Sequence, residues 1–376
     1  MKMSRRSLLL GSATLTGIAS VVGAADQKRL ELSRHWAQGL MAADPIPALS
    51  IAVTRGTETL WAEAFGRSDL ELSTTATPTH RFRLGSVSKI VTATAAAQLA
   101  ARGIIDLDAP IGAAMPDLPE PHRATTLRQL LTHRGGIRHY LPKDDAPDAP
   151  GPIDRRLYRT NEGVLAIFIN DPLVAKPGER VSYSTFGYTL ASIVMETVAK
   201  TPFLEILHRE VAAPFELGSL GPDDPISLVS NRVRGYHPGS AIRNVVPDYP
   251  GTWGNIPSNN PAYKWAGGGL LATPLDLARF GAAHLSAGKI SQAALTTLFT
   301  VYTGRTERSP PLGLGWRIDQ DEAGRLRWHH AGGQDGARAS LVVYPKKKLC
   351  IALASNVTGY PGDVNGPSAK LADVWS

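Results

Sequence analysis

Apolar residues form two kinds of pattern along the chain, and each kind occupies its own part of the sequence. Residues 48–54 and 59–65 are apolar and β-prone, and the polar turn Arg55–Glu58 joins them. Before them, residues 26–43 carry apolar side chains at helical spacing. The start of the chain therefore predicts a helix followed by a β-hairpin.

The end of the chain repeats the short-strand pattern. Apolar runs separated by Gly, Pro and Lys turns predict strands at 315–318, 326–329, 340–344 and 349–353. Between the two ends, residues 88–298 show mostly helical patterns broken by long loops rich in Pro and Gly. Together these patterns predict an α/β (α+β) fold.

The predicted fold has two parts. Residues 26–85 and 300–376 would form an antiparallel sheet with flanking helices, and residues 86–299 would form a mostly helical domain inserted between them. A cleft where two such parts meet is a common place for an active site.

Residues 1–25 have the pattern of a secretory leader, with a basic start, an apolar stretch and small residues before Asp26. The run Ser4-Arg5-Arg6-Ser7-Leu8-Leu9 is similar to a twin-arginine signal, which exports folded proteins, and a general secretory leader is the alternative. We expect cleavage after Ala24 or Ala25. The mature protein would then be periplasmic or secreted, without stable membrane insertion.

The composition limits the kinds of molecule that the protein is expected to bind. The formal net charge is +7, and +4 without the three basic residues of the leader. No basic run alternates with aromatic residues, and Lys346–Lys348 fits a hairpin turn, so nucleic acid is not an expected partner. Cys350 is the only cysteine, which excludes an internal disulfide, and its apolar surroundings predict a buried strand residue.

The strongest candidate for a catalytic motif is Ser86-Val-Ser-Lys89. The apolar run that follows predicts a helix from Lys89 to Arg102, ending at Gly103. Residues three apart share a helix face, so the Lys89 amine can lie beside the Ser86 hydroxyl. The positive end of the helix dipole disfavours the ammonium form of Lys89, and a serine beside an unprotonated lysine is an activated nucleophile for acyl transfer.

The same spacing recurs in Ser286-Ala-Gly-Lys289. About one such match is expected by chance in a chain of this length. This copy follows a predicted helix over 275–285, where the dipole is negative and would keep the lysine protonated. We therefore interpret Ser286 as an ordinary helix terminus.

Further segments support a catalytic role for Ser86-Val-Ser-Lys89. Tyr183-Ser184-Thr185 precedes an apolar helical run, and His330-Ala331-Gly332-Gly333 leads into a predicted strand. Two longer segments complete the set, His133 to Tyr140 and Tyr263 to Thr273.

This ordered series resembles the serine β-lactamase and penicillin-binding superfamily, and within it the class C β-lactamase and D-Ala-D-Ala carboxypeptidase branch. The segments are most similar to the mitochondrial serine β-lactamase-like group and its bacterial relatives. The resemblance covers roughly residues 47–357, and its specificity is high because four motifs recur in order.

The resemblance implies a role for each residue of the series. Ser86 would be the acylated nucleophile. Lys89 would be its proton acceptor, or would polarise it through a shared hydrogen bond. Tyr183 would be the relay that protonates the leaving group and helps to activate water. His330 would place a positive or hydrogen-bonding group opposite Tyr183. The amides of Ser86 and Gly333 would form the oxyanion hole.

Small residues at Gly332 and Gly333 would let the backbone approach the substrate closely. Two departures from the family pattern affect this interpretation. Thr185 stands where most class C enzymes have Asn, which weakens the case for a dedicated β-lactam hydrolase and fits a peptide or ester substrate. Residues 369–375 form only a stub where relatives usually continue into a longer helix that covers the sheet.

The leading hypothesis is an exported serine hydrolase that forms an acyl-enzyme and cleaves an amide, peptide, ester or β-lactam bond. Its substrate would be a small molecule or peptide, including one derived from the cell wall. Two alternatives remain open: a penicillin- or cell-wall-binding protein that acylates without efficient turnover, and an oligomeric scaffold with a vestigial site.

No cofactor is expected. A zinc site could be proposed from four histidines, but no His-Glu-x-x-His motif or Cys partner accompanies them, and we expect no metal. These histidines are His133, His139, His329 and His330.

Overall fold

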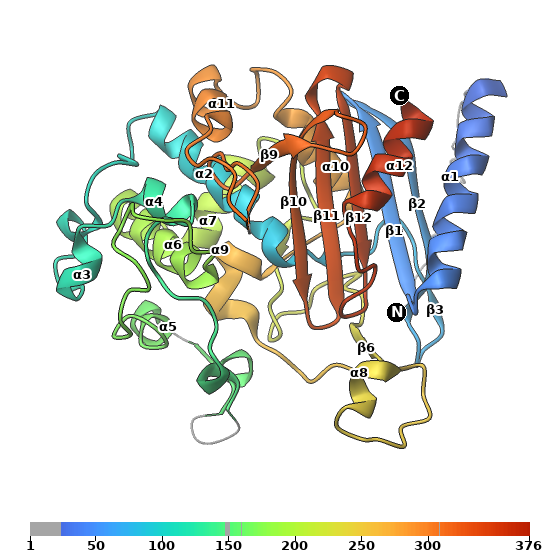
Figure 1. Cartoon of the computed structure of the whole chain (residues 1–376), viewed down its shortest axis with the longest axis horizontal. Coiled ribbons are helices and arrows are strands. Elements are labelled where there is room, and N and C mark those ends of the chain that lie inside the picture. Colours follow the sequence, from blue (N-terminus) through green and yellow to red (C-terminus); the bar gives the residue numbers. More distant parts are fainter. Residues whose placement is uncertain (1–23, 147–150, 159, 308) are drawn as a thin grey trace, which may run out of the picture.

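The computed structural model describes residues 24–146, 151–158, 160–307 and 309–376. Its main element is a seven-stranded antiparallel sheet in the order β3-β2-β1-β12-β11-β10-β9 (Figure 1). The strands are β1 (Ala48–Arg55), β2 (Glu58–Asp69), β3 (Thr74–Thr75), β9 (Arg317–Gln320), β10 (Leu326–Gln334), β11 (Ala337–Tyr344) and β12 (Leu349–Ser355). The predicted α/β (α+β) class is confirmed, because both ends of the chain contribute strands to this sheet.

The predicted strands occur with shifted ends, and the largest shift is in β10, which runs to Gln334 and not to His329 as predicted. The hairpin of β1 and β2 forms where expected, and Pro345–Lys347 makes the turn between β11 and β12. β9 begins at Arg317, two residues later than predicted. Gly315 explains the shift, because its φ of +77° is incompatible with a strand.

The two central strands are buried on both faces. β12 is buried throughout, and in β1 only Arg55 is not. Ala52 pairs with Ala352 on the face toward the helices of the middle segment, and the small side chains let those helices approach. On the other face, larger residues form a separate apolar cluster, which includes Leu49, Ile51, Val53, Leu349, Ile351 and Leu353.

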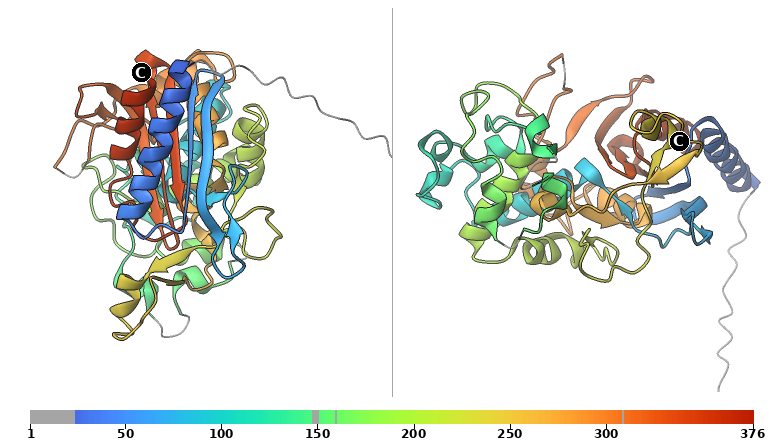
Figure 2. Two further views of the ribbon diagram at one scale, coloured as in Figure 1. Left: turned by 90° about the vertical axis from the view of Figure 1, so that its right-hand side faces the viewer. Right: turned by 90° about the horizontal axis from the view of Figure 1, so that it is seen from below.

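That second cluster is covered by α1 (Ala24–Ala43) and α12 (Gly366–Trp375), which lie on the same face of the sheet (Figure 2). The Trp375 indole is 2% exposed and donates a hydrogen bond to Ser33 Oγ at 3.0 Å. The predicted stub at 369–375 belongs to this helix, which starts at Gly366, and Trp375 at its end packs in the core. Its length relative to that of relatives stays a prediction.

The middle of the chain is mostly helical, as predicted, and lies beside the sheet (Figure 1). Its helices are α2 (Ser88–Ala101), α3 (Glu120–Arg123), α4 (Leu127–Leu131), α5 (Asn161–Leu165), α6 (Thr185–Ala199), α7 (Phe203–Leu207), α8 (Gly239–Arg243), α9 (Trp265–Gly268), α10 (Pro274–Ala283) and α11 (Gln292–Phe299). Short strands make a three-stranded sheet of β4 (Phe82–Arg83), β8 (Leu270–Ala272) and β5 (Gly221–Pro222), and a ribbon of β6 (Tyr236–Pro238) and β7 (Trp253–Asn255).

One helix of the predicted helical domain packs against the sheet of the other predicted domain. α10 lies within 86–299 but packs against β1, β11 and β12 of the large sheet. At Gly281 an added Cβ would lie 3.0 Å from a Val343 methyl group, so this helix approaches the strands closely. The division of the chain at residues 86 and 299 stays a prediction.

The predicted leader falls almost entirely on residues 1–23, outside the described part of the chain, and the expected cleavage point lies at the start of α1. Among the described residues, no helix combines the length and apolar character needed to cross a membrane. Cys350 is fully buried in β12, as predicted, and burial raises the pKa of its thiol to about 12.

A buried histidine joins α10 to α2 and makes the stability of the fold depend on pH. His284 is 1% exposed, with Nδ1 2.8 Å from the Phe280 carbonyl oxygen and Nε2 2.9 Å from Thr94 Oγ1. Burial lowers the pKa of His284 to about 4, from an ordinary value of 6.5. The unfolded chain therefore binds a proton between these pH values that the folded chain does not.

We predict that the free energy of unfolding falls as pH is lowered from 6.5 to 4. The His284 contribution approaches about 1.4 kcal/mol per pH unit. Denaturant titrations over this range should give a smaller slope for His284→Gln than for the unmodified protein. The exposed His35→Gln variant is the control and should keep the original slope. An unchanged slope in His284→Gln would contradict the assignment.

Candidate active site

The predicted nucleophile lies on a short 3-10 turn, η1 (Gly85–Val87), that runs directly into α2. Gly85 has a φ of +50°, and a Cβ added there would lie 2.8 Å from the Gly333 amide nitrogen. The turn therefore requires glycine at this position. Ser86 is partly exposed, whereas Lys89 in the first turn of α2 is fully buried.

The Lys89 amine has three oxygen partners. Its Nζ lies 3.2 Å from Ser86 Oγ, 3.2 Å from Thr185 Oγ1 and 2.5 Å from the Gly267 carbonyl oxygen. An ammonium can donate to all three. A neutral amine can donate to Thr185 and Gly267 and accept the Ser86 hydroxyl proton with its lone pair. The site thus accommodates both protonation states.

Burial favours the neutral state. It lowers the pKa of Lys89 below the ordinary value, partly opposed by the charge of Tyr183. The Tyr183 pKa is raised by burial, but the charge of Lys89 and hydrogen bonds to Lys89 and Ser86 outweigh this and leave it below its ordinary value. Amine and phenol therefore act as one coupled pair that can take a proton from Ser86.

Tyr183 is held just before α6, whose N-cap is Ser184. The Ser184 hydroxyl accepts a hydrogen bond from the Gly187 amide at 2.9 Å. The Tyr183 ring lies between two imidazoles, with ring centres 4.3 Å from His133 and 5.4 Å from His139. This packing orients the phenol toward the nucleophile turn, the residues Gly85–Val87 that include Ser86.

Both imidazoles act as hydrogen-bond acceptors. The Ser184 amide donates to His133 Nδ1 at 3.2 Å, and the Thr185 amide donates to His139 Nδ1 at 3.3 Å. Burial, followed by the charge of Lys89, lowers the pKa of His139 to about 4 and that of His133 well below 6.5. The two histidines thus hold the tyrosine motif as neutral rings. No group of three or more His, Cys, Asp or Glu side chains in the described ranges could hold a metal ion.

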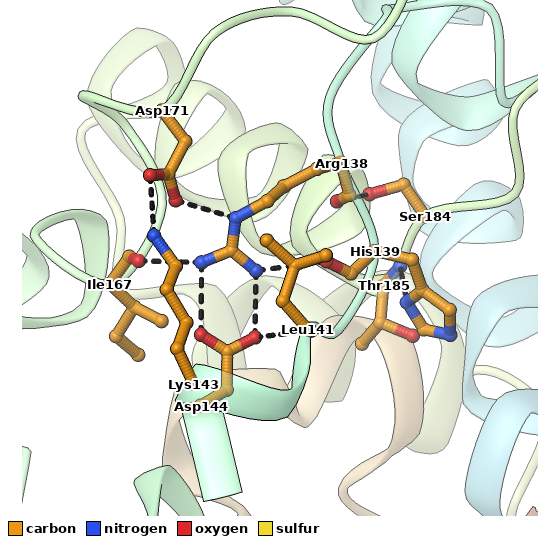
Figure 3. Close-up of polar contacts among 9 residues, drawn as sticks. All are labelled: Arg138, His139, Leu141, Lys143, Asp144, Ile167, Asp171, Ser184 and Thr185. Atoms are coloured by element: carbon orange, nitrogen blue, oxygen red, sulfur yellow. Dashed lines mark hydrogen bonds and ion pairs between the residues drawn. The ribbon is translucent and has the colours of Figure 1, made fainter. Parts of the chain in front are cut away.

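Arg138 anchors the segment that carries His139 (Figure 3). Its guanidinium donates to Asp144 at 2.7 and 3.0 Å and to Asp171 at 2.5 Å. The remaining donors reach the carbonyl oxygens of His139 and Ile167, both at 2.9 Å. The Arg138 carbonyl oxygen in turn accepts the Ser184 hydroxyl at 2.7 Å. This network fixes the 138–144 loop against the start of α6.

Strand β10 forms the opposite wall of the site. A Cβ added to Gly332 would lie 2.0 Å from the Leu84 carbonyl oxygen and 2.9 Å from the Ser86 amide nitrogen. The strand can pass the nucleophile turn this closely only because position 332 has no side chain. The amides of Ser86 and Gly333, the predicted oxyanion hole, thus lie on adjoining segments, and their role stays a prediction.

His330 lies on β10, 2% exposed, and lines a cavity together with Tyr183 and His133. Its Nδ1 lies 2.7 Å from the Ala331 carbonyl oxygen, to which it donates. Burial, with the charges of Arg317 and Lys89, lowers the pKa of His330 well below 6.5. Of the two predicted options, these surroundings favour a neutral, hydrogen-bonding His330 over a positive one.

Two cavities flank the Ser86–Tyr183 pair. The larger, of about 830 Å³, is lined by Tyr183 and His330 and contains the guanidinium groups of Arg180 and Arg317. The smaller, of about 260 Å³, is lined by Ser86, Thr185, Gly333 and Lys264 among others. The structure thus brings every predicted site residue to one region.

Sequence reasoning missed several residues of this region. Arg317 supplies the positive charge beside Tyr183 that His330 lacks, and Lys264 enters the smaller cavity. Arg138 lies in the segment from His133 to Tyr140, but nothing in the sequence indicated which carboxylates it would contact. A basic residue two positions after Gly315, at the start of a short strand, was the only signal for Arg317.

The fold is that of the serine β-lactamase and penicillin-binding class of proteins. The family model described as Beta-lactamase matches residues 34–374, so the chain belongs to the β-lactamase family. The predicted family and fold class are thereby confirmed.

Individual relatives agree with this assignment. The mitochondrial serine beta-lactamase-like protein LACTB of Mus musculus is 26% identical over 314 residues, which cover 65% of this chain and 55% of the mouse protein. The chain thus spans about half the length of this curated relative.

Two solved structures share the fold. A structure of the octameric penicillin-binding protein homologue from Pyrococcus abyssi has a TM-score of 0.77 and 22% identity, and the match covers 92% of this chain and 78% of that one. A D-amino acid amidase from Ochrobactrum anthropi SV3 has a TM-score of 0.75 and 21% identity, with 91% and 98% of the two chains covered.

We predict that Arg138→Met strongly destabilises the protein. Arg138 and Asp144 are both 4% exposed, so removal of the guanidinium leaves a buried carboxylate without its partner, at a cost of about 3–5 kcal/mol. Chemical denaturation measures this loss. The control is Arg209→Met, which breaks an exposed pair with Glu205 and should cost no more than about 0.5 kcal/mol. Equal losses in the two variants would contradict a structural role for the Arg138 network.

Proposed function

We propose that the chain is a serine hydrolase that forms an acyl-enzyme at Ser86 and cleaves an amide, peptide or ester bond. The observation that carries the proposal is the buried Lys89 amine, 3.2 Å from the partly exposed Ser86 hydroxyl, at a point that two cavities flank. Membership of the β-lactamase family supports it.

In the proposed acylation step, the coupled pair of Lys89 and Tyr183 accepts the Ser86 hydroxyl proton while Oγ attacks the substrate carbonyl carbon. The amides of Ser86 and Gly333 donate hydrogen bonds to the oxyanion that forms. Tyr183 then gives a proton to the departing amine or alcohol, and the acyl group remains on Ser86.

Deacylation reverses the roles. Tyr183, with Lys89 charged beside it, takes a proton from a water molecule, and the resulting hydroxide attacks the ester carbon. Arg317 and Arg180 surround this step with positive charge, which favours a phenolate and an anionic intermediate. The acid product leaves, and Ser86 regains its proton. The proposed reaction uses only side chains, backbone amides and water.

Two observations bear on the substrate class. Thr185 has a side-chain hydroxyl where most class C enzymes have the side-chain amide of Asn, and this hydroxyl accepts a hydrogen bond from Lys89. This difference favours an amide, peptide or ester substrate over a β-lactam. Among proteins of this fold, one similar structure is a D-amino acid amidase. We further propose that the protein is exported, because residues 1–25 carry a twin-arginine-like leader pattern.

The two Ser-x-x-Lys motifs give a matched pair of variants. We predict that Ser86→Ala abolishes labelling by a fluorophosphonate and lowers turnover by about 10⁴-fold, whereas Ser286→Ala changes neither. Ser286 is exposed beyond the end of α10, and Lys289 pairs there with Glu216 at 2.6 Å. Intact-mass spectrometry measures the labelling. The acyl-enzyme proposal fails if the unmodified protein gains no adduct with any acylating probe, or if Ser86→Ala still gains one.

Removing the phenol should slow the second half of the reaction. We predict that Tyr183→Phe lowers the deacylation rate by about 10²–10⁴-fold, because the proton acceptor for water is lost. The lifetime of the acyl adduct, followed by mass spectrometry after a pulse of p-nitrophenyl ester, measures this rate. Tyr249→Phe is the control, since Tyr249 lies after α8 and lines neither cavity.

The same time course distinguishes the alternative function. In a penicillin-binding protein without turnover, the adduct of the unmodified protein would persist for hours and Tyr183→Phe would not lengthen its lifetime. A hydrolase loses the adduct during the assay.

A further inference from the structure

The smaller cavity beside Ser86 contains an unusual number of charged groups. Asp145, Asp154, Asp335 and Lys264 all line it, together with the amide side chains of Asn259 and Gln334. These residues come from three separate segments of the chain that meet at the nucleophile turn. The cavity therefore carries several charged and polar side chains.

Most of these groups have no partner in the protein. None of the four charged side chains forms an ion pair with any described residue. Asn259 is 9% exposed, and its buried Oδ1 accepts no hydrogen bond from the described part of the chain. Both polar atoms of the Gln334 amide are likewise buried and unpaired. Buried polar atoms without partners are costly, so their presence here points to a ligand.

The balance of charge indicates a cation. Three carboxylates and one amine line the cavity, and burial lowers the pKa of Lys264 to about 8, so this amine loses its charge more easily than an exposed lysine. The two other nearby cations do not pair with these carboxylates. Arg83 pairs with Asp223 at 2.7 Å and reaches only the backbone carbonyl oxygen of Asp335, at 3.2 Å, and Lys89 is fully buried. The unpaired oxygens of Asn259 and Gln334 add acceptors for a hydrogen-bond donor.

The cation must be organic and joined to the reacting group. The described carboxylates do not converge into a group that could hold a metal ion. The cavity also includes Ser86, Thr185 and Gly333, so its occupant lies beside the nucleophile. A primary ammonium, with three donors, suits several separated acceptors better than a metal ion does.

We propose that this cavity binds the acyl part of the substrate through a free primary ammonium group. The preferred substrates are then amino-acyl amides or esters whose amino group is unblocked. This inference rests on the proposed acyl-enzyme at Ser86, and it names the substrate class of that site.

The test compares pairs of substrates that differ only in the amino group. Alanine p-nitroanilide and N-acetylalanine p-nitroanilide, each as the D and L enantiomer, are assayed for kcat/KM with the unmodified protein. We expect the free amine to be preferred by about tenfold or more in at least one enantiomer. In Asp154→Asn and Asp335→Asn this ratio should fall about tenfold, and in the double variant it should approach one.

The ratio is measured within each variant, so a partial loss of folded protein does not alter it. Asp117→Asn removes the same charge from an exposed loop before α3 that lines neither cavity, and it should keep the original ratio. Lys264→Met should raise the ratio, because it removes the cation that competes for the carboxylates.

A binding measurement separates this inference from the proposed function. Calorimetric titration of Ser86→Ala with alanine amide and with N-acetylalanine amide should show tighter binding of the free amine. Equal or weaker binding of the free amine, or a preference of the unmodified protein for N-acetyl substrates, overturns the ammonium site while the hydrolase proposal stands. Preferential binding of the amine without any acylation of Ser86 supports the ammonium site and overturns the hydrolase proposal.

Discussion

The burial of Lys89 is the constraint on which the rest of the site depends. An ammonium taken out of water must lose its proton or gain compensating partners. Here the partners are oxygens from the nucleophile turn, the start of α6 and α9, and burial lowers the pKa of the amine as well. Three segments far apart in the sequence are thereby tied to one geometry. The proposed reactivity of Ser86 and the cost of folding around a buried amine have the same origin.

The sheet completes this geometry from the other side. β10 can lie against the nucleophile turn because Gly332 and Gly85 leave room for backbone alone. The contact fixes the distance between the sheet and the helical part and brings the Ser86 and Gly333 segments side by side. The tyrosine motif is fixed separately, by neutral imidazoles and by the Arg138 network. The proposed chemistry therefore takes place between two rigid supports.

Much of this arrangement could be predicted from the sequence. The spacing of Ser86 and Lys89 on a helix start, and the strand patterns at both ends of the chain, depend on local rules, and local rules transfer. The burial of a side chain and the identity of its hydrogen-bond partners depend on distant segments, and local rules do not predict them. Nothing near His330 in the sequence states that it is buried and neutral, and nothing near Arg317 or Lys264 states that each meets the site. The same reason hid the anchoring of α12, whose last turn is stabilised by a serine on α1.

The pairing of β1 with β12 has a consequence for how the protein is made. β1 is bonded along its whole length to a strand near the other end of the chain, and β10, which abuts the nucleophile turn, is also made late. A nascent chain cannot close this sheet before residues 349–355 have been made. The wall that β10 forms beside Ser86 is likewise made long after the serine itself, so the proposed chemistry depends on strands that are translated late.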